Sequence, residues 1–468
     1  MQKSEAYYNK MKNTPILKLI IILAIPTTIS MLITNIYNAV DTYFVGVLGE
    51  SPQAATGVVF TLQCIIQAFS FMLGHGSGTY VAKKLADKDI DGASRYVSTA
   101  FFDGAFIGTV LLIFGITFLN PFMRLLGSSD TVLPYSMQYG LWILISAPFM
   151  ITSLILNNIL RYEGKAFYSM IGLVTGALLN IFGDYIFINV MNLGVFGAGM
   201  STGTSQIISF LILLILFIKN AQSKINFKYF TLNFTVHFEI FKGGLPSLLR
   251  QGLTSISGGI LNNLVMPYGD SALAAISVTN RCSNLIMCTG LGIGQGLQPV
   301  AAFNYEVKDY SRVKKGMFVA LFLSLIVVCS ISIVCIIIPD KIIWLFQKKE
   351  EVINVGINAL RYAAIGVMFL PISVTANMLF QSIRKNLIAS ILSTLRSGAI
   401  FIPLLLIFSV TDLGFNGIIL AQPISDIIAS AISIIFIIYF VIKTPNTVVE
   451  EKKSENIFEN CENNEKNQ

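Results

Sequence analysis

The sequence predicts an all-α polytopic membrane protein, with twelve transmembrane helices in two six-helix bundles. Three observations predict this fold: an apolar composition, a series of apolar runs long enough to cross a bilayer, and an internal repeat. Hydrophobic residues make up 54% of the chain and charged residues 12%, whereas a soluble domain carries about a quarter charged residues. The mean hydropathy of +0.71 agrees with a chain that lies mostly inside a membrane.

The apolar runs predict the spans directly. A helix needs about 20 apolar residues to cross a hydrocarbon core of about 30 Å, and such runs recur from residue 16 onward. We expect no cleavable signal peptide, because the first run is long and follows a charged stretch. The predicted spans are residues 16–46, 53–80, 95–119, 133–159, 167–190, 195–218, 241–266, 274–300, 313–338, 352–380, 387–410 and 415–442.

The internal repeat appears when the chain is laid over itself with a shift of 220 residues. Pro26 then falls on Pro246, Asn157 falls on Asn377, and GESPQAA falls on GDSALAA. Each copy holds six spans, so the two copies share one orientation and are related by a pseudo-two-fold axis along the membrane normal. The predicted organisation is an N-terminal lobe at 1–220, a cytoplasmic linker at 221–240, a C-terminal lobe at 241–443 and a disordered tail at 444–468.

The distribution of charge predicts the topology. The formal net charge is +7, and most Lys and Arg residues lie in the loops on the side of the two termini. Because positive loops stay inside, both termini are predicted to be cytoplasmic, and the charge does not indicate nucleic-acid binding. The six cysteines have no paired spacing in an outer loop, which predicts neither disulfides nor a metal site.

Polar residues in the spans of the first half have no counterpart in the second half. The 220-residue shift places Asp41, Asn180 and Asp184 on leucine or isoleucine. Asp41, Asp184 and Thr202 each lie about five to seven residues from the outer end of a span, or roughly 8–11 Å deep. Tyr37 shares the face of Asp41 because it lies one helical turn away. The predicted pocket consists of Tyr37, Asp41, Asn180, Asp184 and Thr202.

Two carboxyl groups in one poorly hydrated pocket cannot both ionise without a large cost, so they should titrate as a coupled pair. The pocket can hold a proton, or a sodium ion with Asp41, Asn180, Asp184 and Thr202 as oxygen ligands. The alternative is that these groups only join helices by hydrogen bonds. Acids inside a membrane cost about 2.5–3.5 kcal/mol on insertion scales and mark functional paths, which favours the ion site.

Two further sets of residues are candidates. Pro26 lies in the inner part of the first span and gives that helix a place to bend, although Pro246 at the equivalent position also fits a simple packing kink. In the second half, Arg361, Arg396 and Asp426 lie at similar depth, and the negative charge of Asp426 can offset the positive charge of an arginine. We expect them to form a polar network, for which a structural role is favoured over substrate binding.

Several stretches together resemble the MATE family of multidrug and toxic compound extrusion transporters. They are NAVDTYFVG in span 1, NIFGD in span 5, LRYEGK after span 4 and GIGQGLQPVAAFNY in span 8, and the similarity covers roughly residues 10–445. The chain is most similar to the MepA-like, DinF-related branch. The resemblance implies cation-coupled export of amphipathic, often cationic compounds by alternating access between two lobes. It also implies that the cation pocket of the branch maps onto Tyr37, Asp41, Asn180, Asp184 and Thr202. Other branches carry an acid where this chain has Thr254.

The resulting hypothesis is a multi-pass antiporter of the cytoplasmic membrane. It would export drugs or toxic metabolites in exchange for H⁺ or Na⁺, work as a monomer without a cofactor, and contribute to antibiotic resistance. A lipid-linked oligosaccharide flippase of the same superfamily is the alternative. A channel is disfavoured because the ion pocket lies in one lobe only. An enzyme is not expected, since the chain has no H-E-x-x-H motif and no paired nucleophile and base.

Overall fold

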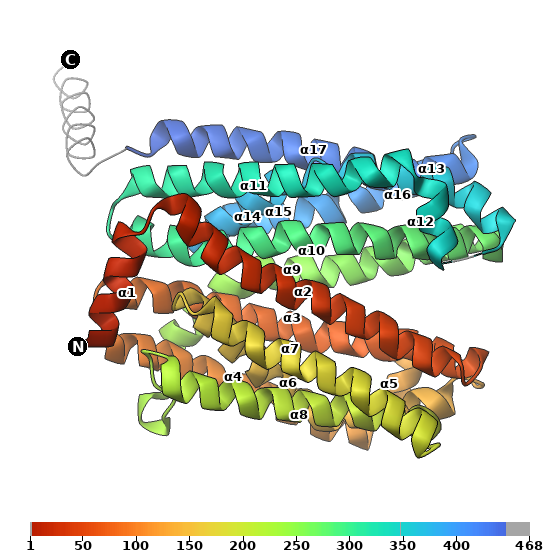
Figure 1. Cartoon of the computed structure of the whole chain (residues 1–468), viewed down its shortest axis with the longest axis horizontal. Coiled ribbons are helices and arrows are strands. Elements are labelled where there is room, and N and C mark those ends of the chain that lie inside the picture. Colours follow the sequence, from red (N-terminus) through yellow and green to blue (C-terminus); the bar gives the residue numbers. More distant parts are fainter. Residues whose placement is uncertain (1, 347, 446–468) are drawn as a thin grey trace.

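A computed structural model describes residues 2–346 and 348–445 of the chain, and the regular structure in these residues is helical (Figure 1). The first half contains nine helical elements: α1 (Gln2–Asn13), α2 (Ile16–Gly46), α3 (Glu50–Ala86), α4 (Ile90–Thr117), α5 (Leu119–Leu125), α6 (Leu133–Tyr162), α7 (Ala166–Asp184), the π-helix η1 (Tyr185–Val190) and α8 (Gly194–Asn220). A short helix, η2 (Phe227–Tyr229), lies in the linker.

The second half repeats this order. Its elements are α9 (Phe234–Val265), η3 (Met266–Tyr268), α10 (Asp270–Glu306), α11 (Tyr310–Ile337), α12 (Pro339–Phe346), α13 (Glu350–Val367), α14 (Leu370–Ser382), α15 (Asn386–Thr394), the π-helix η4 (Leu395–Ala399), α16 (Phe401–Ser409) and α17 (Gly414–Lys443). The predicted tail falls almost entirely on residues 446–468, which lie outside the described residues.

The predicted fold class is confirmed. Ten helical segments of the described chain are each long and apolar enough to cross a membrane, and α13 with α14 forms an eleventh segment bent by 42°. The remaining long helix, α9, has 32 residues and completes the set of twelve. Polar residues in its middle, including Arg250 and Gln251, lower its hydropathy below that of the others.

Three of the predicted spans are less regular than the sequence suggested, and one of them, at 167–190, ends in the π-helix η1. The span predicted at 352–380 breaks between α13 and α14, where Pro371 occupies the first turn of the second helix. The span predicted at 387–410 passes through the π-helix η4 between α15 and α16. The amphipathic helix α1 precedes the first span and was not predicted. Its Tyr7 hydroxyl donates to Tyr162 O at 3.1 Å, which ties α1 to the end of α6.

The 220-residue repeat is visible in the helix boundaries. Helices α3 and α10 both have 37 residues and begin at Glu50 and Asp270. Backbone conformation repeats as well, since Lys88 and Lys308 both have a φ of 59°. The copies therefore share their turns as well as their spans. The exact lobe boundaries at 220 and 241 stay a prediction.

The two lobes pack through glycines at one end of the bundle, on α3 against α9 and on α10 against α2. A Cβ atom on Gly244 would lie 1.9 Å from Met72 O, and one on Gly76 would lie 2.0 Å from Ile240 O. On α10, a Cβ on Gly292 would lie 2.2 Å from Thr28 Oγ1. Only glycine allows such close backbone approach. We call this end, which carries α1 (Figure 1), the closed end.

The opposite end, which carries α5 and α12 (Figure 1), lacks this contact. A Cβ added to Gly57 of α3, or to Gly252, Gly258 or Gly259 of α9, would meet no atom within 4 Å. The same pair of helices that touches backbone to backbone near α1 is therefore separated farther along. We call this the open end of the molecule.

Candidate cation site in the first lobe

The predicted pocket residues lie on three helices of the first lobe. Tyr37 and Asp41 are one turn apart on α2, Asn180 and Asp184 are one turn apart on α7, and Thr202 lies on α8. Helix α7 packs against both α2 and α8, which brings the three polar faces together. All five side chains are buried, with exposed fractions from 0% at Asp184 to 7% at Asp41.

A chain of hydrogen bonds connects four helices at this point. Tyr139 on α6 donates its hydroxyl to Asp41 Oδ2 at 2.7 Å, and its oxygen lies 3.0 Å from Thr202 Oγ1. Asn180 Nδ2 donates to the same Thr202 Oγ1 at 3.0 Å. Tyr37 OH accepts a long hydrogen bond of 3.5 Å from Gln206 Nε2. The structure therefore places the predicted residues of α2, α7 and α8 in one polar cluster.

Asp184 joins this cluster through its charge. Neither of its carboxylate oxygens accepts a hydrogen bond, although both are buried. The negative charges of Asp41 and Asp184 repel each other, and both act on the Tyr37 hydroxyl. Asp184 is also the last residue of α7 before the helix widens into the π-helix η1. Such π-turns occur often at functional sites.

Four oxygen atoms of the cluster are buried without a hydrogen-bond donor. They are Asp41 Oδ1, Asn180 Oδ1 and the two oxygens of Asp184. Buried polar atoms are nearly always satisfied, so four such oxygens in one place call for a positive partner. Carboxylate and amide oxygens are hard ligands that suit an alkali cation, and a carboxylate pair can also share a proton. The donor set therefore fits either ion.

Sequence reasoning missed Tyr139, Gln206 and Ser201. Tyr139 is central because it joins Asp41 to Thr202, and it is 2% exposed. Ser201 Oγ donates to Asn180 O at 2.9 Å and holds α8 against α7. A depth argument applied to span 4 would have included Tyr139, but a tyrosine in an apolar helix gives no sign of its partners. The described residues contain no cluster of three or more His, Cys, Asp or Glu side chains able to hold a metal.

The second lobe has a smaller polar group. Arg396 Nε donates to Asp426 Oδ1 at 2.8 Å, and Gln422 Nε2 donates to the same oxygen at 2.9 Å. Arg361 lies apart from this pair, because its side chain is directed to Ile336 O and is exposed. The predicted three-residue network is thus reduced to the Arg396–Asp426 pair. Thr254 bonds to Ser397 Oγ at 3.2 Å and supplies no acid at the position where other branches are expected to carry one.

Pro26 lies within α2 and is buried. Proline cannot donate the helical hydrogen bond that its position would otherwise require. The hydroxyls of Thr27 and Ser30 instead bond back to the carbonyls of Leu23 and Pro26 at 2.7 and 2.9 Å. Helix α2 therefore combines the ion-site residues Tyr37 and Asp41 with a weakened turn toward the closed end.

A second polar network crosses between the lobes at the closed end. Arg161 of α6 donates to Gln295 and Gln298 of α10, and also to Asn158 at 2.6 Å. Its side chain is only 2% exposed. The Nδ1 atom of His75 on α3 lies 2.7 Å from Ser247 Oγ on α9. The bonds from Arg161 to α10 and from His75 to α9 add specific contacts between the lobes to the glycine packing.

Outside the spans, Glu163 fastens the linker between the lobes. Its Oε2 accepts from Gln222 N at 2.6 Å and its Oε1 accepts from Ser223 N at 3.1 Å. Burial raises the pKa of the Glu163 carboxyl, and the Ser223 hydroxyl, the two amides and Lys165 offset part of this effect. The LRYEGK stretch therefore serves two contacts, Arg161 between the lobes and Glu163 to the linker.

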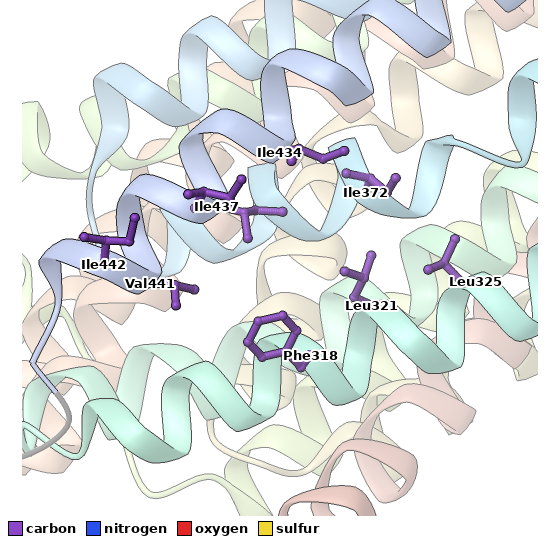
Figure 2. A pocket seen from close by; sticks show the side chains of 9 residues that line it. Phe318, Leu321, Leu325, Ile372, Ile434, Ile437, Val441 and Ile442 are labelled. Atoms are coloured by element: carbon purple, nitrogen blue, oxygen red, sulfur yellow. The ribbon is translucent and has the colours of Figure 1, made fainter.

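The surface of the second lobe carries a separate apolar groove (Figure 2). It has a volume of about 350 Å³ and lies among residues of α11, α14 and α17. Figure 2 shows Phe318 and Leu321 on one side facing Ile434 and Ile437 on the other. The lining has no polar side chain, so this groove has no ligand for an ion.

Comparisons with known proteins agree with this architecture. The model of the MatE family matches residues 26–186 and 246–407, two segments offset by the same 220 residues as the repeat. The multidrug export protein MepA of Staphylococcus aureus (strain MSSA476) is 26% identical over 444 residues, covering 94% of this chain and 96% of MepA. MepA of Staphylococcus saprophyticus is 24% identical, also over 94% of this chain and 96% of its own length.

Solved structures show the same fold. An outward-facing multidrug resistance MATE family transporter superposes with a TM-score of 0.86 at 24% identity, covering 92% of this chain and 98% of that one. A MOP superfamily transporter from Pyrococcus furiosus, described as having a binding pocket of reverse polarity, superposes with a TM-score of 0.85 at 24% identity. The match covers 92% of this chain and 98% of that one.

Proposed function

Because this chain belongs to the MatE family, we propose that it is a secondary active transporter of the cytoplasmic membrane that exports amphipathic compounds in exchange for H⁺ or Na⁺. The observation that carries the proposal is the set of four buried oxygens at Asp41, Asn180 and Asp184 that have no hydrogen-bond donor. A bound cation satisfies these oxygens and removes the repulsion between the two carboxylates. The similarity to MepA supports drugs or toxic metabolites as the cargo.

Alternating access accounts for the closed and open ends of the molecule. With both termini in the cytoplasm, as the positive loops indicate, the closed end is cytoplasmic and the open end faces outward. The described conformation then lets an external ion approach the first lobe. To change to the inward-open conformation, the close contacts at Gly76 and Gly244 must separate while the outer ends of the lobes come together.

Ion binding is coupled to this change through α2. Asp41 contributes an oxygen ligand, and α2 packs against α10 of the other lobe. Neutralising Asp41 and Asp184 changes how closely α2 and α7 can approach, and the weakened turn at Pro26 lets α2 bend at a defined place. The released cargo leaves on the outer side, and dissociation of the ion on the inner side resets the cycle. Pro26 is therefore a bending point in the proposal and does not contact the ion.

The driving force is sufficient for useful accumulation. Each charge that moves inward down a potential of 100 mV supplies about 2.3 kcal/mol, which corresponds to a concentration ratio of about 50. Two ions would square that ratio, and a chemical gradient of the ion would add to it. We propose a monomer as the working unit, because one chain carries both lobes and a complete ion site. The exchange needs no cofactor, since the ion itself provides the energy.

The experiment is efflux of a fluorescent cationic dye from proteoliposomes under separately imposed proton and sodium gradients. Wild-type protein should export the dye with one of the two gradients, and Asp41→Asn and Asp184→Asn should each reduce gradient-driven export by at least tenfold. Thr204→Ala is a matched control, because Thr204 lies on α8 near the site but bonds only to its own helix. If the wild type exports the dye under neither gradient, the proposal is contradicted. Undiminished gradient-driven export in both Asp variants also contradicts it. Movement of a lipid-linked sugar without dye export would favour the flippase.

A further inference from the structure

Near the open end, the charged residues inside the membrane are divided between the two lobes by sign. The interior of the first lobe near the open end has the acids Asp41 and Asp184, and both are buried behind neighbouring helices. The spans of the second lobe instead carry several arginines, and only Asp426 lies deep in them as an acid. Ionisable residues at this depth are costly and mark binding sites or transport paths. The arginines therefore require partners.

Arg281 is the clearest case. It lies on α10, which begins at Asp270, so it is about 16 Å from the open end of that helix. Its side chain is exposed, and within the described part of the chain no hydrogen bond or ion pair to it is found. Arg396, by comparison, is neutralised by Asp426. Arg281 is thus an arginine at membrane depth without a protein counterion.

The face of α10 that carries Arg281 is turned toward the first lobe. Cys288 lies two turns farther along the same face, and its sulfur accepts a hydrogen bond of 2.9 Å from Asn35 Nδ2 of α2. Asn284 and Ser277 lie on this face as well, and both are exposed. An exposed polar stripe on a membrane-spanning helix must face water or cargo, because lipid cannot hydrogen-bond to it. Arg281 therefore projects into the space between the lobes at the open end.

Arg250 on α9 provides a second positive charge nearer the closed end. Its Nη1 donates to Asn377 Oδ1 at 3.1 Å, so the only hydrogen-bond partner of its side chain in the described residues is neutral. Arg161 and Arg396 add their positive charge around it and repel its guanidinium. Arg250 thus belongs with the positive charges near the closed end, and Arg281 is the arginine that projects into the space between the lobes at the open end.

We propose that Arg281 binds an anionic group, specifically a carboxylate, on an amphipathic compound that this protein transports. This inference rests on the proposed export function and specifies its substrate class as zwitterionic or acidic amphiphiles. A guanidinium pairs with a carboxylate through two parallel hydrogen bonds and is weakly hydrated, which suits release of the cargo into water after reorientation. The acids of the first lobe stay reserved for the coupling ion, because Tyr139 and the helices around them exclude large molecules.

The test compares one xanthene dye in two forms, the zwitterion with a free carboxylate and the cation in which that carboxylate is a methyl ester. Binding of each form to purified protein is measured by fluorescence anisotropy. The wild type should bind the zwitterion at least tenfold more tightly than the ester. Arg281→Gln should weaken zwitterion binding by about tenfold or more, the range for hydrogen bonds to charged groups. Binding of the ester should stay the same or strengthen.

Two further variants separate this effect from changes in folding or net charge. Arg281→Lys keeps the charge and should keep part of the preference for the zwitterion. Arg124→Gln removes one positive charge from an exposed residue of the short helix α5, whose partner is Asp130 at 2.7 Å, and should change neither affinity. Equal wild-type affinity for both dyes, no binding of the zwitterion, or equal losses of both dyes in Arg281→Gln overturns the proposal. Export of the ester under an ion gradient tests the proposed function separately.

Discussion

Tyr139 on α6 donates a hydrogen bond of 2.7 Å to Asp41 on α2, and its oxygen lies 3.0 Å from Thr202 on α8. One phenolic hydroxyl thus joins three helices at the proposed ion site. Because Asp41 is buried, this donor is a main source of stabilisation for its ionised form. The residue is neither an acid nor an ion ligand in the described contacts, yet the geometry of the site depends on it.

Tyr139→Phe should slow gradient-driven export by about tenfold or more while leaving the protein folded. The variant removes one hydrogen bond to a charged group, which contributes about 1.5–3 kcal/mol, but keeps the ring and its packing. Export rate in proteoliposomes and melting temperature are measured together. Tyr135→Phe, one turn away on the same helix and partly exposed, is the control. Equal rates for Tyr139→Phe and wild type would show that Tyr139 does not support the ion site.

Gly244→Ala should shift the protein away from the described conformation. The added methyl would lie 1.9 Å from Met72 O and 2.5 Å from Met72 C, so the backbone of α3 leaves no room for it. Separation of the lobes at the closed end is the simplest relief, with a cost of about 1–3 kcal/mol to this state. Distances between spin labels at the two ends report the shift. Gly259→Ala, where a methyl meets nothing within 4 Å, should leave the distances unchanged. Identical distances in both variants would contradict the glycine seal.

The Arg396–Asp426 pair should behave as a structural pair. Asp426 is 1% exposed, so Asp426→Asn or Arg396→Gln alone leaves one buried charge without its partner. Each change should lower stability by about 3–5 kcal/mol, measured as a fall in melting temperature. The double variant Arg396→Met with Asp426→Leu should recover much of that loss. If the double variant loses as much stability as the two single variants added together, the two residues do not act as a pair.

Glu163→Gln should change how stability depends on pH. Burial raises the pKa of Glu163 in the folded protein above its unfolded value of about 4.3. The stabilising contribution linked to this shift is therefore complete below the unfolded pKa and is lost as pH rises through the folded pKa. The Gln variant cannot titrate there. The stability of wild type relative to the variant should fall as the pH rises above about 4.3, as measured by thermal melting in both proteins. A constant difference would show that the carboxyl does not titrate in this range.

Much of the fold could be predicted from the sequence because hydropathy and helix length are set by the membrane. The cluster of Asp41, Asn180 and Asp184 could be predicted because the helical rise fixes depth and a four-residue spacing fixes a shared face. Depth alone does not predict a contact when it is unknown which way the helix turns the side chain. Arg361 has the same depth as Arg396, but α13 turns its side chain toward α11 and away from Asp426.

Other features depended on contacts that no local pattern reveals. Helix α1 is too polar to read as a span, and it is held by long-range contacts such as Lys10 Nζ to Gly164 O at 2.8 Å. Asp103 on α4 has His237 of α9 as a partner, with His237 Nδ1 at 2.8 Å from its Oδ2, and the two residues are 134 positions apart in the chain. The π-helices after Asp184 and at Leu395–Ala399 also gave no signal in the sequence. Each arises from packing between segments far apart in the chain.

The central claim is that Asp41 and Asp184 act as one ion-binding unit. The most direct measurement is ion binding to purified protein, as proton uptake and as sodium binding by calorimetry, for wild type, Asp41→Asn, Asp184→Asn and the double variant. The account predicts that each single variant loses nearly as much ion affinity as the double variant, because one ion is shared by both carboxyls. Losses that simply add, or wild-type affinity in either single variant, would contradict it.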